Sequence, residues 1–203
     1  IEYQYVTENF VISFDSLRGW RHITPMTDNT DLAALIRNIP DYPKPGIMFR
    51  DVSTLLLDGA GFRATIDRLA ALVAPDTELI AGIEARGFIV AAGLSYALGL
   101  GKLMLRKPGK LPGEKIGTDY QLEYGTDRIE MHVGHVRPGQ KVLLVDDLIA
   151  TGGTALAGID LITQAGGLVE QALFIVDLPE LGGAEKLKAR GIRVNSLIGF
   201  DGH

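Results

Sequence analysis

At 203 residues, 46% of them hydrophobic, the chain is long enough to bury one sizeable core, and it is predicted to form a single domain. Its 20 lysines and arginines against 25 aspartates and glutamates give a formal charge of -5, which excludes a general electrostatic attraction to nucleic acid or to an anionic membrane. The sequence contains no cysteine, which excludes disulfides and thiolate metal sites, and we expect a cytoplasmic protein.

The first predicted element is a helix that follows Thr30, a residue suited to the N-cap position. Apolar residues recur with helical spacing over 32–39, and Pro40 ends the run. Residues 41–51 contain two prolines and a glycine, which favour extended and turn conformations. We therefore expect an ordered surface loop that presents Phe49 and its neighbours.

Beyond this loop, apolar runs alternate with helical patterns. The apolar runs predict buried strands at 52–57, 79–83, 103–105, 142–145 and 173–176. The helical patterns lie at 62–73, 88–98 and 156–162. This alternation predicts an α/β fold with a mainly parallel sheet flanked by helices, in which ligands bind at the carboxyl ends of the strands.

One long polar interruption, residues 107–119, is rich in glycine, proline and lysine. We interpret this segment as a flexible lid loop, because its glycines and prolines make it long and jointed. A solvated basic loop is the competing interpretation.

The most specific pattern is VLLVDDLIATGGT, residues 142–154: a buried strand, two carboxylates and a small-residue turn that leads into a helix. The turn can direct N–H groups and hydroxyls at a phosphate, because glycine allows close approach and the helix offers unpaired donors. The carboxylates can accept hydrogen bonds from the vicinal hydroxyls of a ribose. The predicted pentose 5-phosphate site comprises Asp146, Asp147, Ala150, Thr151, Gly152, Gly153 and Thr154.

This segment resembles the phosphoribosyl diphosphate signature of the type I phosphoribosyltransferases. It matches neither the nucleotide-binding P-loop nor the dinucleotide-binding glycine pattern. The resemblance extends from about Asp31 to the C-terminus. It implies a phosphoribosyltransferase domain at residues 31–203, preceded at residues 1–30 by an N-terminal extension of open role that includes the start of the first helix.

A second predicted turn, AGIEARGF at residues 81–88, resembles the diphosphate-binding turn of the family, with Ile83 where a small polar residue is common. Arg86 can form paired hydrogen bonds with phosphate oxygens. The resemblance implies diphosphate contacts at Ala85, Arg86, Lys107 and Lys110, and a homodimer in which the basic lid reaches the neighbouring subunit. It also implies Mg2+ bound mainly through the diphosphate donor, with no metal ligand assigned to a protein side chain.

The segments at residues 41–51 and 120–125 resemble those of the adenine-using members of the family. By that likeness, Phe49 and Leu178 stack on the two faces of adenine, and main-chain groups of Met48 and Arg50 read its edge. Alternatively, the side chains of Phe49 and Leu178 pack in the hydrophobic core and do not contact a base. Glu123 resembles the acid/base residue of the family and is the predicted catalytic residue, since a carboxylate stabilises the positive charge that grows on the ribose ring.

Three other functions remain open from the sequence. A phosphoribosyltransferase for xanthine, hypoxanthine or orotate is the nearest alternative. A regulator that senses the donor and binds DNA would need a recognition domain, and no helix-turn-helix pattern or basic patch stands in the first 30 residues. A catalytically idle structural subunit is the third. The expected partners are adenine and phosphoribosyl diphosphate, with no nucleic acid and no membrane.

Overall fold

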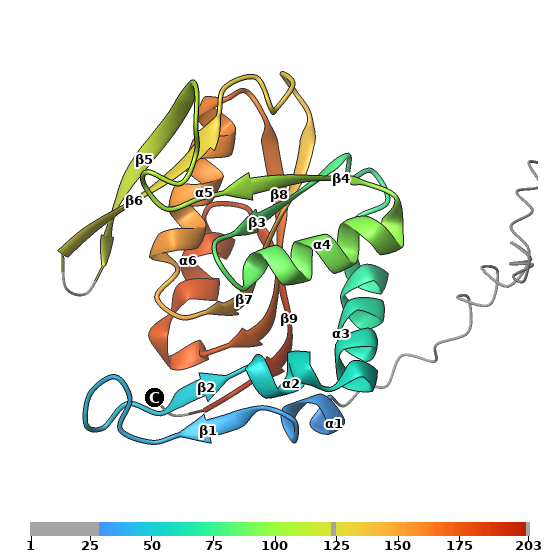
Figure 1. The fold of residues 1–203 in the computed structure, drawn as a ribbon, viewed down its shortest axis with the longest axis vertical. Coiled ribbons are helices and arrows are strands. Elements are labelled where there is room, and N and C mark those ends of the chain that lie inside the picture. The colour runs from blue at the N-terminus through green and yellow to red at the C-terminus, as the bar shows by residue number, and fades with distance from the viewer. Residues whose placement is uncertain (1–28, 123–124, 202–203) are drawn as a thin grey trace, which may run out of the picture.

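The computed structural model describes residues 29–122 and 125–201, and its centre is a five-stranded parallel sheet with the strand order β4-β3-β7-β8-β9 (Figure 1). The strands are β3 (Leu79–Ile83), β4 (Gly101–Leu105), β7 (Lys141–Ile149), β8 (Leu168–Asp177) and β9 (Arg193–Gly199). The predicted α/β class is confirmed, because four of the five predicted strands lie in this sheet.

Helices cover both faces of the sheet (Figure 1). On one face, α3 (Gly59–Leu72) and α4 (Gly87–Leu98) bury apolar residues against β3, β7 and β8. On the other face, α5 (Gly153–Gln164) and α6 (Gly183–Ala189) do the same. The central strands are buried on both sides, which explains why they read as continuous apolar runs in the sequence.

In the part of the chain that the structure describes, two antiparallel hairpins lie outside the central sheet. The longer one pairs β5 (Lys115–Leu122) with β6 (Gly125–His132), and it buries Tyr120, Ile129 and Met131 in the same core as α5. The shorter one pairs β1 (Arg37–Ile39) with β2 (Phe49–Asp51) between the short helices α1 (Thr30–Ala33) and α2 (Ser53–Leu57). A 3-10 turn, η2 (Pro179–Leu181), connects β8 to α6.

The prediction of one helix across residues 32–39 is wrong. The helix ends at Ala33, its N-cap is Asn29 rather than Thr30, and residues 37–39 form β1. The strand forms because residues 37–39 pair with β2, and because the residue before Pro40 is biased toward an extended conformation.

The prediction of a buried strand at residues 52–57 is also wrong, because this run forms α2. The carboxylate of Asp51 accepts the N–H of Ser53 at 2.9 Å and so favours a helical turn. Within the helix Leu55 is buried, whereas Leu57 is 85% exposed. A short apolar run does not distinguish a strand from a helix by periodicity.

The predicted lid at residues 107–119 is only partly a loop, because β5 begins at Lys115. The residue that precedes the lid, Arg106, forms reciprocal backbone hydrogen bonds of 2.8 and 2.7 Å with Glu130 of β6. The flexibility of the remaining residues stays a prediction. Among residues 29–122 and 125–201, no helix has the length and apolar character to cross a membrane.

Asp51 anchors the β1–β2 hairpin, and its replacement is expected to weaken the fold. Hydrogen bonds from Ser53 and then from Arg37 lower the pKa of the buried Asp51 carboxyl from 3.8 to about 2. Asp51→Asn is expected to lower the free energy of unfolding at pH 7 by about 1–3 kcal/mol, because a neutral amide replaces a buried carboxylate. Because the folded-state pKa is depressed, this stabilisation is complete above the ordinary pKa and is lost as the pH falls toward 2.

Urea unfolding of both proteins between pH 7 and pH 2.5 measures this difference. Asp160→Asn is the matched control, since its ion pair with Arg190 is exposed and is expected to contribute less than about 1 kcal/mol. Equal losses in the two variants, or a difference that does not shrink in acid, would contradict the role of Asp51.

Candidate active site

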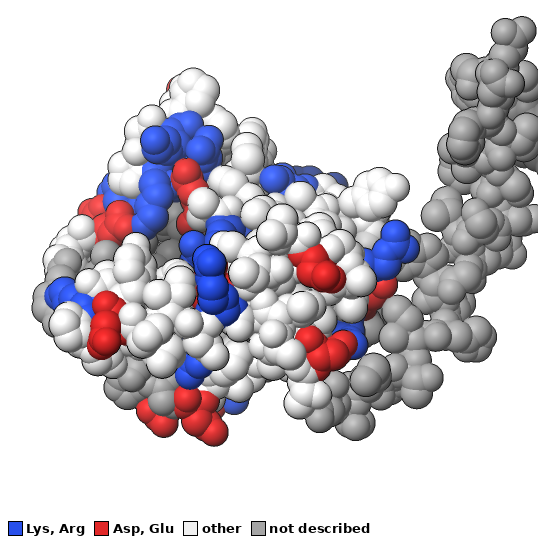
Figure 2. Space-filling model, turned by 60° about the horizontal axis from the view of Figure 1, so that its bottom comes forward, with Lys and Arg blue, Asp and Glu red and all other residues white. Residues whose placement is uncertain are grey.

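A cavity of about 280 Å³ lies at the carboxyl ends of β3 and β7. It is lined by residues 83–86, by Lys107 and by residues 146–155. The structure therefore brings together the two turns that the sequence singled out, at the sheet edge where parallel α/β folds bind ligands. Figure 2 shows lysine and arginine side chains, with some acidic ones among them, around a hollow on one face of the molecule.

The predicted phosphate loop wraps the start of α5. Gly152 has a φ of +80°, a left-handed conformation that favours glycine, and α5 begins at Gly153. The unpaired N–H groups of the first helical turn therefore lie at the cavity, as an anion site requires. The cavity lining includes the predicted residues Ala150, Thr151, Gly152, Gly153 and Thr154.

The back of the phosphate loop is packed against the start of α6. The N–H of Gly183 donates to the carbonyl oxygen of Ala150 at 3.0 Å, and a Cβ on Gly183 would lie 2.2 Å from that oxygen. The ammonium of Lys186 donates to the carbonyl oxygen of Thr151 at 2.9 Å. The loop is thus held in shape by residues that do not line the cavity.

Gly183 and Lys186 were not among the residues that the sequence pointed to. They lie some thirty residues beyond the loop, and only the path of β8 and η2 brings them back to it. The Gly182-Gly183 pair at the start of a helix was the one available signal, because a glycine pair there indicates close backbone approach.

The two predicted ribose carboxylates lie side by side at the cavity. Burial and the adjacent Asp147 carboxylate raise the pKa of Asp146 well above its ordinary value. Asp146 accepts the N–H of Asp147 at 2.9 Å, and a Cβ on Gly87 at the start of α4 would lie 2.6 Å from it. The two loops of the cavity are therefore in direct contact.

Arg86, the predicted diphosphate ligand, forms an ion pair with Asp147, with Nε and Oδ2 2.5 Å apart. The side chain of Arg86 is 47% exposed, whereas that of Asp147 is 8% exposed. The side chain predicted to bind diphosphate, Arg86, is thus paired with a side chain predicted to bind ribose, Asp147. Ala85 lines the cavity beside Arg86.

Glu84 connects this turn to the base of the lid. Its carboxylate accepts hydrogen bonds from Arg106 at 3.2 Å and from the backbone N–H of Lys107 at 2.8 Å. Hydrogen bonds from Arg106 lower the pKa of Glu84 despite its burial. The sequence placed Glu84 within the predicted diphosphate turn, but it did not reveal that Glu84 pairs with Arg106.

The two predicted lid lysines are placed differently. Lys107 lines the cavity. Lys110 is exposed and does not line it, although its charge helps to lower the pKa of Glu84. The structure thus places Lys107 beside the predicted diphosphate turn, whereas Lys110 lies outside the cavity lining.

The residues predicted to bind the base lie at the same edge of the sheet but outside the lining of this cavity. Met48 and Phe49 are half-buried at the start of β2, where the ring of Tyr42 meets that of Phe49 edge-on at 5.2 Å. The guanidinium of Arg50 lies 4.4 Å from the ring centroid of Phe200. Leu178 follows β8 and donates its N–H to the carbonyl oxygen of Ile149 at 3.0 Å.

Glu123, the predicted catalytic residue, lies outside the described residues. Its neighbours in the described part of the chain are the end of β5 at Leu122 and the start of β6 at Gly125. Its role therefore stays a prediction from the sequence.

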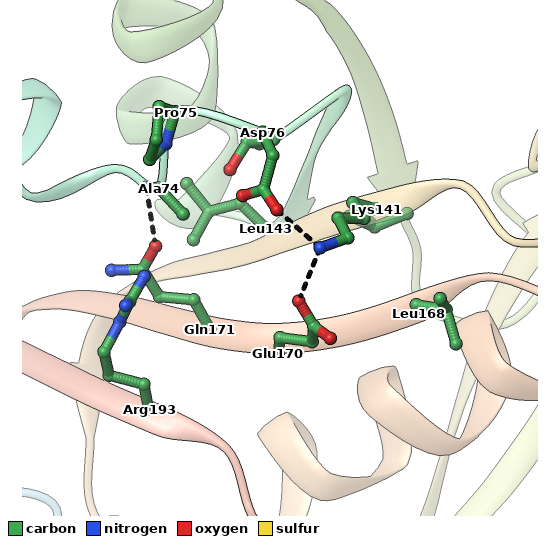
Figure 3. Close-up of a pocket in the computed structure, with 11 residues that line it drawn as sticks. Ala74, Pro75, Asp76, Lys141, Leu143, Leu168, Glu170, Gln171 and Arg193 are labelled. Atoms are coloured by element: carbon green, nitrogen blue, oxygen red, sulfur yellow. Dashed lines mark hydrogen bonds and ion pairs between the residues drawn. The ribbon is translucent and has the colours of Figure 1, made fainter.

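A larger hollow, of about 420 Å³, lies at the opposite edge of the sheet, where β7, β8 and β9 begin (Figure 3). Its lysine, Lys141, forms ion pairs with Asp76 and Glu170, and its buried Gln171 bonds to the backbone of Leu72 and Ala74. These polar groups satisfy one another. The hollow also lies at the amino ends of the strands, so it is the weaker candidate for the active site.

Comparison with known proteins agrees with this geometry. The model of the Phosphoribosyl transferase domain matches residues 56–190, which include both turns and the β5–β6 hairpin. The chain is also 61% identical to the adenine phosphoribosyltransferase of Erythrobacter litoralis over 175 residues, which are 85% of this chain and 98% of the relative. The chain belongs to the adenine phosphoribosyltransferase family.

Solved structures of adenine phosphoribosyltransferases share the fold. The enzyme from Thermoanaerobacter pseudethanolicus is 45% identical with a TM-score of 0.80, and the match covers 84% of this chain and 99% of that one. The enzyme from Saccharomyces cerevisiae, complexed with adenine and an imino-altritol bisphosphate, is 33% identical with a TM-score of 0.76, over 83% of this chain and 97% of that one. The predicted type I phosphoribosyltransferase fold is confirmed.

Proposed function

We propose that the chain transfers the phosphoribosyl group of 5-phosphoribosyl 1-diphosphate to adenine, giving AMP and diphosphate. The observation that carries this proposal is the cavity at the end of β7, where an anion loop and two carboxylates adjoin an arginine-bearing turn. A ribose with a 5-phosphate at one end and a diphosphate at the other matches these three features in order. Membership of the adenine phosphoribosyltransferase family supports adenine as the acceptor.

In the proposed reaction, N9 of adenine forms a bond to C1 of the ribose, and the C1–oxygen bond breaks with its electron pair leaving on diphosphate. The proton of N9 is released. We assign the 5-phosphate to residues 151–154, the ribose hydroxyls to Asp146 and Asp147, and the diphosphate to Ala85, Arg86, Lys107 and Lys110. Donors that are already oriented stabilise the departing charge without further reorganisation.

We assign the base to the region beside the β1–β2 hairpin, with Phe49 and Leu178 on the two faces of adenine and the main chain of Met48 and Arg50 at its edge. Support comes from the half-buried state of the two apolar side chains, which leaves part of each accessible to a flat heterocycle. We assign to Glu123 the stabilisation of the positive charge on the ribose ring, or the removal of the N9 proton.

Donor binding must exchange one internal ion pair for two contacts with the substrate. Asp147 and Arg86 form an ion pair with each other in the structure. A carboxylate is a hydrogen-bond acceptor for ribose hydroxyls, whereas the guanidinium suits phosphate oxygens. Breaking this ion pair costs least when the donor contacts both residues, Asp147 through its ribose hydroxyls and Arg86 through its diphosphate. Ribose 5-phosphate has no diphosphate, so we expect it to bind more weakly than the intact donor.

Mg2+ fits the proposed site mainly as a partner of the donor. The described residues contain no group of three or more histidine, aspartate or glutamate side chains that could hold a metal ion by themselves. Asp146 and Asp147 nevertheless supply hard oxygen atoms at the cavity, which suit Mg2+ together with phosphate oxygens and water. When bound, the ion would neutralise charge on the leaving diphosphate.

We also propose a homodimer, in which lid residues beyond Lys107, which lines the cavity of its own chain, reach the partner's donor site. Exposed apolar side chains on α4 and on the edge strand β4 support an interface there: Ile89, Tyr96, Leu98 and Met104, of which Tyr96 is 88% exposed. Analytical ultracentrifugation tests the dimer. The same proposal includes a domain boundary at residue 31, a separate extension before it and a cytoplasmic location.

A labelled-adenine assay with the donor and Mg2+ is expected to yield AMP, since the site complements the donor and the family uses adenine. Competition with unlabelled hypoxanthine, xanthine and orotate measures base selectivity, and adenine is expected to compete best. Formation of another nucleotide in preference to AMP would favour the alternative phosphoribosyltransferases. Binding of the donor without formation of any nucleotide would favour the non-catalytic regulator.

A further inference from the structure

The side chain of Lys107 is held at both ends. At its base, the backbone N–H donates to Glu84 at 2.8 Å, and both residues line the cavity. At its tip, the ammonium donates to the hydroxyl of Tyr120 at 2.9 Å and to the carboxylate of Asp127. A lysine side chain is otherwise long and flexible, so this arrangement restricts where its charge can lie.

The groups that hold the ammonium are themselves fixed. Tyr120 and Asp127 face each other across the β5–β6 hairpin, and the tyrosine hydroxyl donates to Oδ2 of Asp127 at 3.0 Å. The other carboxylate oxygen, Oδ1, accepts the N–H of Arg128 at 2.7 Å. Tyr120 is buried in the core that the hairpin shares with α5, the helix that begins at the phosphate loop.

The pKa shifts of Asp127 and Lys107 show that both side chains are charged, as their hydrogen bond requires. Hydrogen bonding to Lys107 lowers the pKa of Asp127, so its carboxylate is ionised at neutral pH. Burial by itself would lower the pKa of Lys107, but its bonds to Asp127 and Tyr120 raise it. Lys107, one of the residues that line the cavity, therefore keeps its positive charge.

We propose that Asp127 is a positioning residue that, with Tyr120, aims Lys107 at the diphosphate of the donor. An ammonium has three N–H donors, and two are occupied by Tyr120 and Asp127. The third remains for a phosphate oxygen. This inference rests on the proposed function, and it extends the donor site into the β5–β6 hairpin.

A competing effect of Asp127 has the opposite sign. Its negative charge reduces the net attraction of Lys107 for diphosphate, and this would be its whole effect if Asp127 did no more than neutralise the lysine. Removal of the charge would then strengthen donor binding. Positioning predicts weaker donor binding, so the direction of the change decides between the two roles.

The decisive experiment is steady-state kinetics of Asp127→Asn with both substrates varied. The KM for the donor is expected to rise about tenfold or more, while the KM for adenine stays within about twofold, because only the diphosphate contact is disturbed. Asp76→Asn is the matched control, since Asp76 also forms an ion pair with a lysine, Lys141, but lies in the hollow at the opposite edge of the sheet. It is expected to leave both KM values unchanged.

A double-mutant cycle shows whether Asp127 acts through Lys107. In a Lys107→Ala background, Asp127→Asn is expected to have no further effect on the donor KM. Tyr120→Phe, which keeps the buried ring and removes only the hydroxyl, is expected to raise the donor KM by a smaller factor. If Asp127→Asn does not fold, the donor KM of Tyr120→Phe tests the positioning of Lys107 in its place.

An active wild-type enzyme whose donor KM is unchanged or lowered by Asp127→Asn would overturn the proposal, as would full additivity with Lys107→Ala. Failure of the wild-type protein to convert adenine would instead overturn the proposed function. The two failures are therefore distinguishable.

Discussion

The variant Gly183→Ala is expected to lower kcat/KM for the donor by about 100-fold or more, because displacement of a binding loop by about 1 Å has effects of that size. An alanine Cβ at this position would lie 2.2 Å from the carbonyl oxygen of Ala150 and 2.8 Å from the nitrogen of Gly152. Both are backbone atoms of the phosphate loop, so the loop or α6 must move. Initial rates at varied donor concentration measure the effect.

Gly59→Ala provides the control, because a Cβ at the start of α3 meets no atom within 4 Å. It is expected to retain full activity. Thermal unfolding of Gly183→Ala separates a loop effect from general unfolding, since the folded variant should still show a cooperative transition. Normal donor kinetics in the folded variant would refute the view that α6 shapes the phosphate loop.

Glu123→Ala is expected to lower kcat by about 10²–10⁴-fold, the range typical of an acid/base group, while donor binding is mostly kept. The reason is that its carboxylate acts on charge that develops only as the C1–diphosphate bond breaks. Single-turnover kinetics measures the chemical step, and calorimetric titration measures donor affinity.

Glu170→Ala serves as the comparison for this variant, since Glu170 is an exposed glutamate at the opposite edge of the sheet. Its kcat is expected to equal that of the wild type. An unchanged rate in Glu123→Ala would remove the catalytic assignment. It would also revive the alternative of a catalytically idle subunit.

Local sequence patterns predicted the part of the site that is continuous along the chain. Residues 142–154 contain the strand, the two carboxylates and the glycine turn in one continuous stretch. The residue types that this stretch needs could therefore be recognised without knowledge of distant residues. The central strands were predictable for a similar reason, because strands buried on both faces need an unbroken apolar run. The errors at residues 32–39 and 52–57 arose where pairing with β2 and the side chain of Asp51 overrode the local pattern.

By itself, the amino-acid sequence determined the α/β class, the family and the two turns that line the cavity, since each of these is encoded by neighbouring residues. Only the tertiary structure decided which polar groups meet: Arg86 with Asp147, Lys107 with Asp127, and Lys186 with the carbonyl of Thr151. These partners lie 20 to 61 residues apart. An ion pair depends on distance in space, and chain folding sets that distance in ways that no local pattern records.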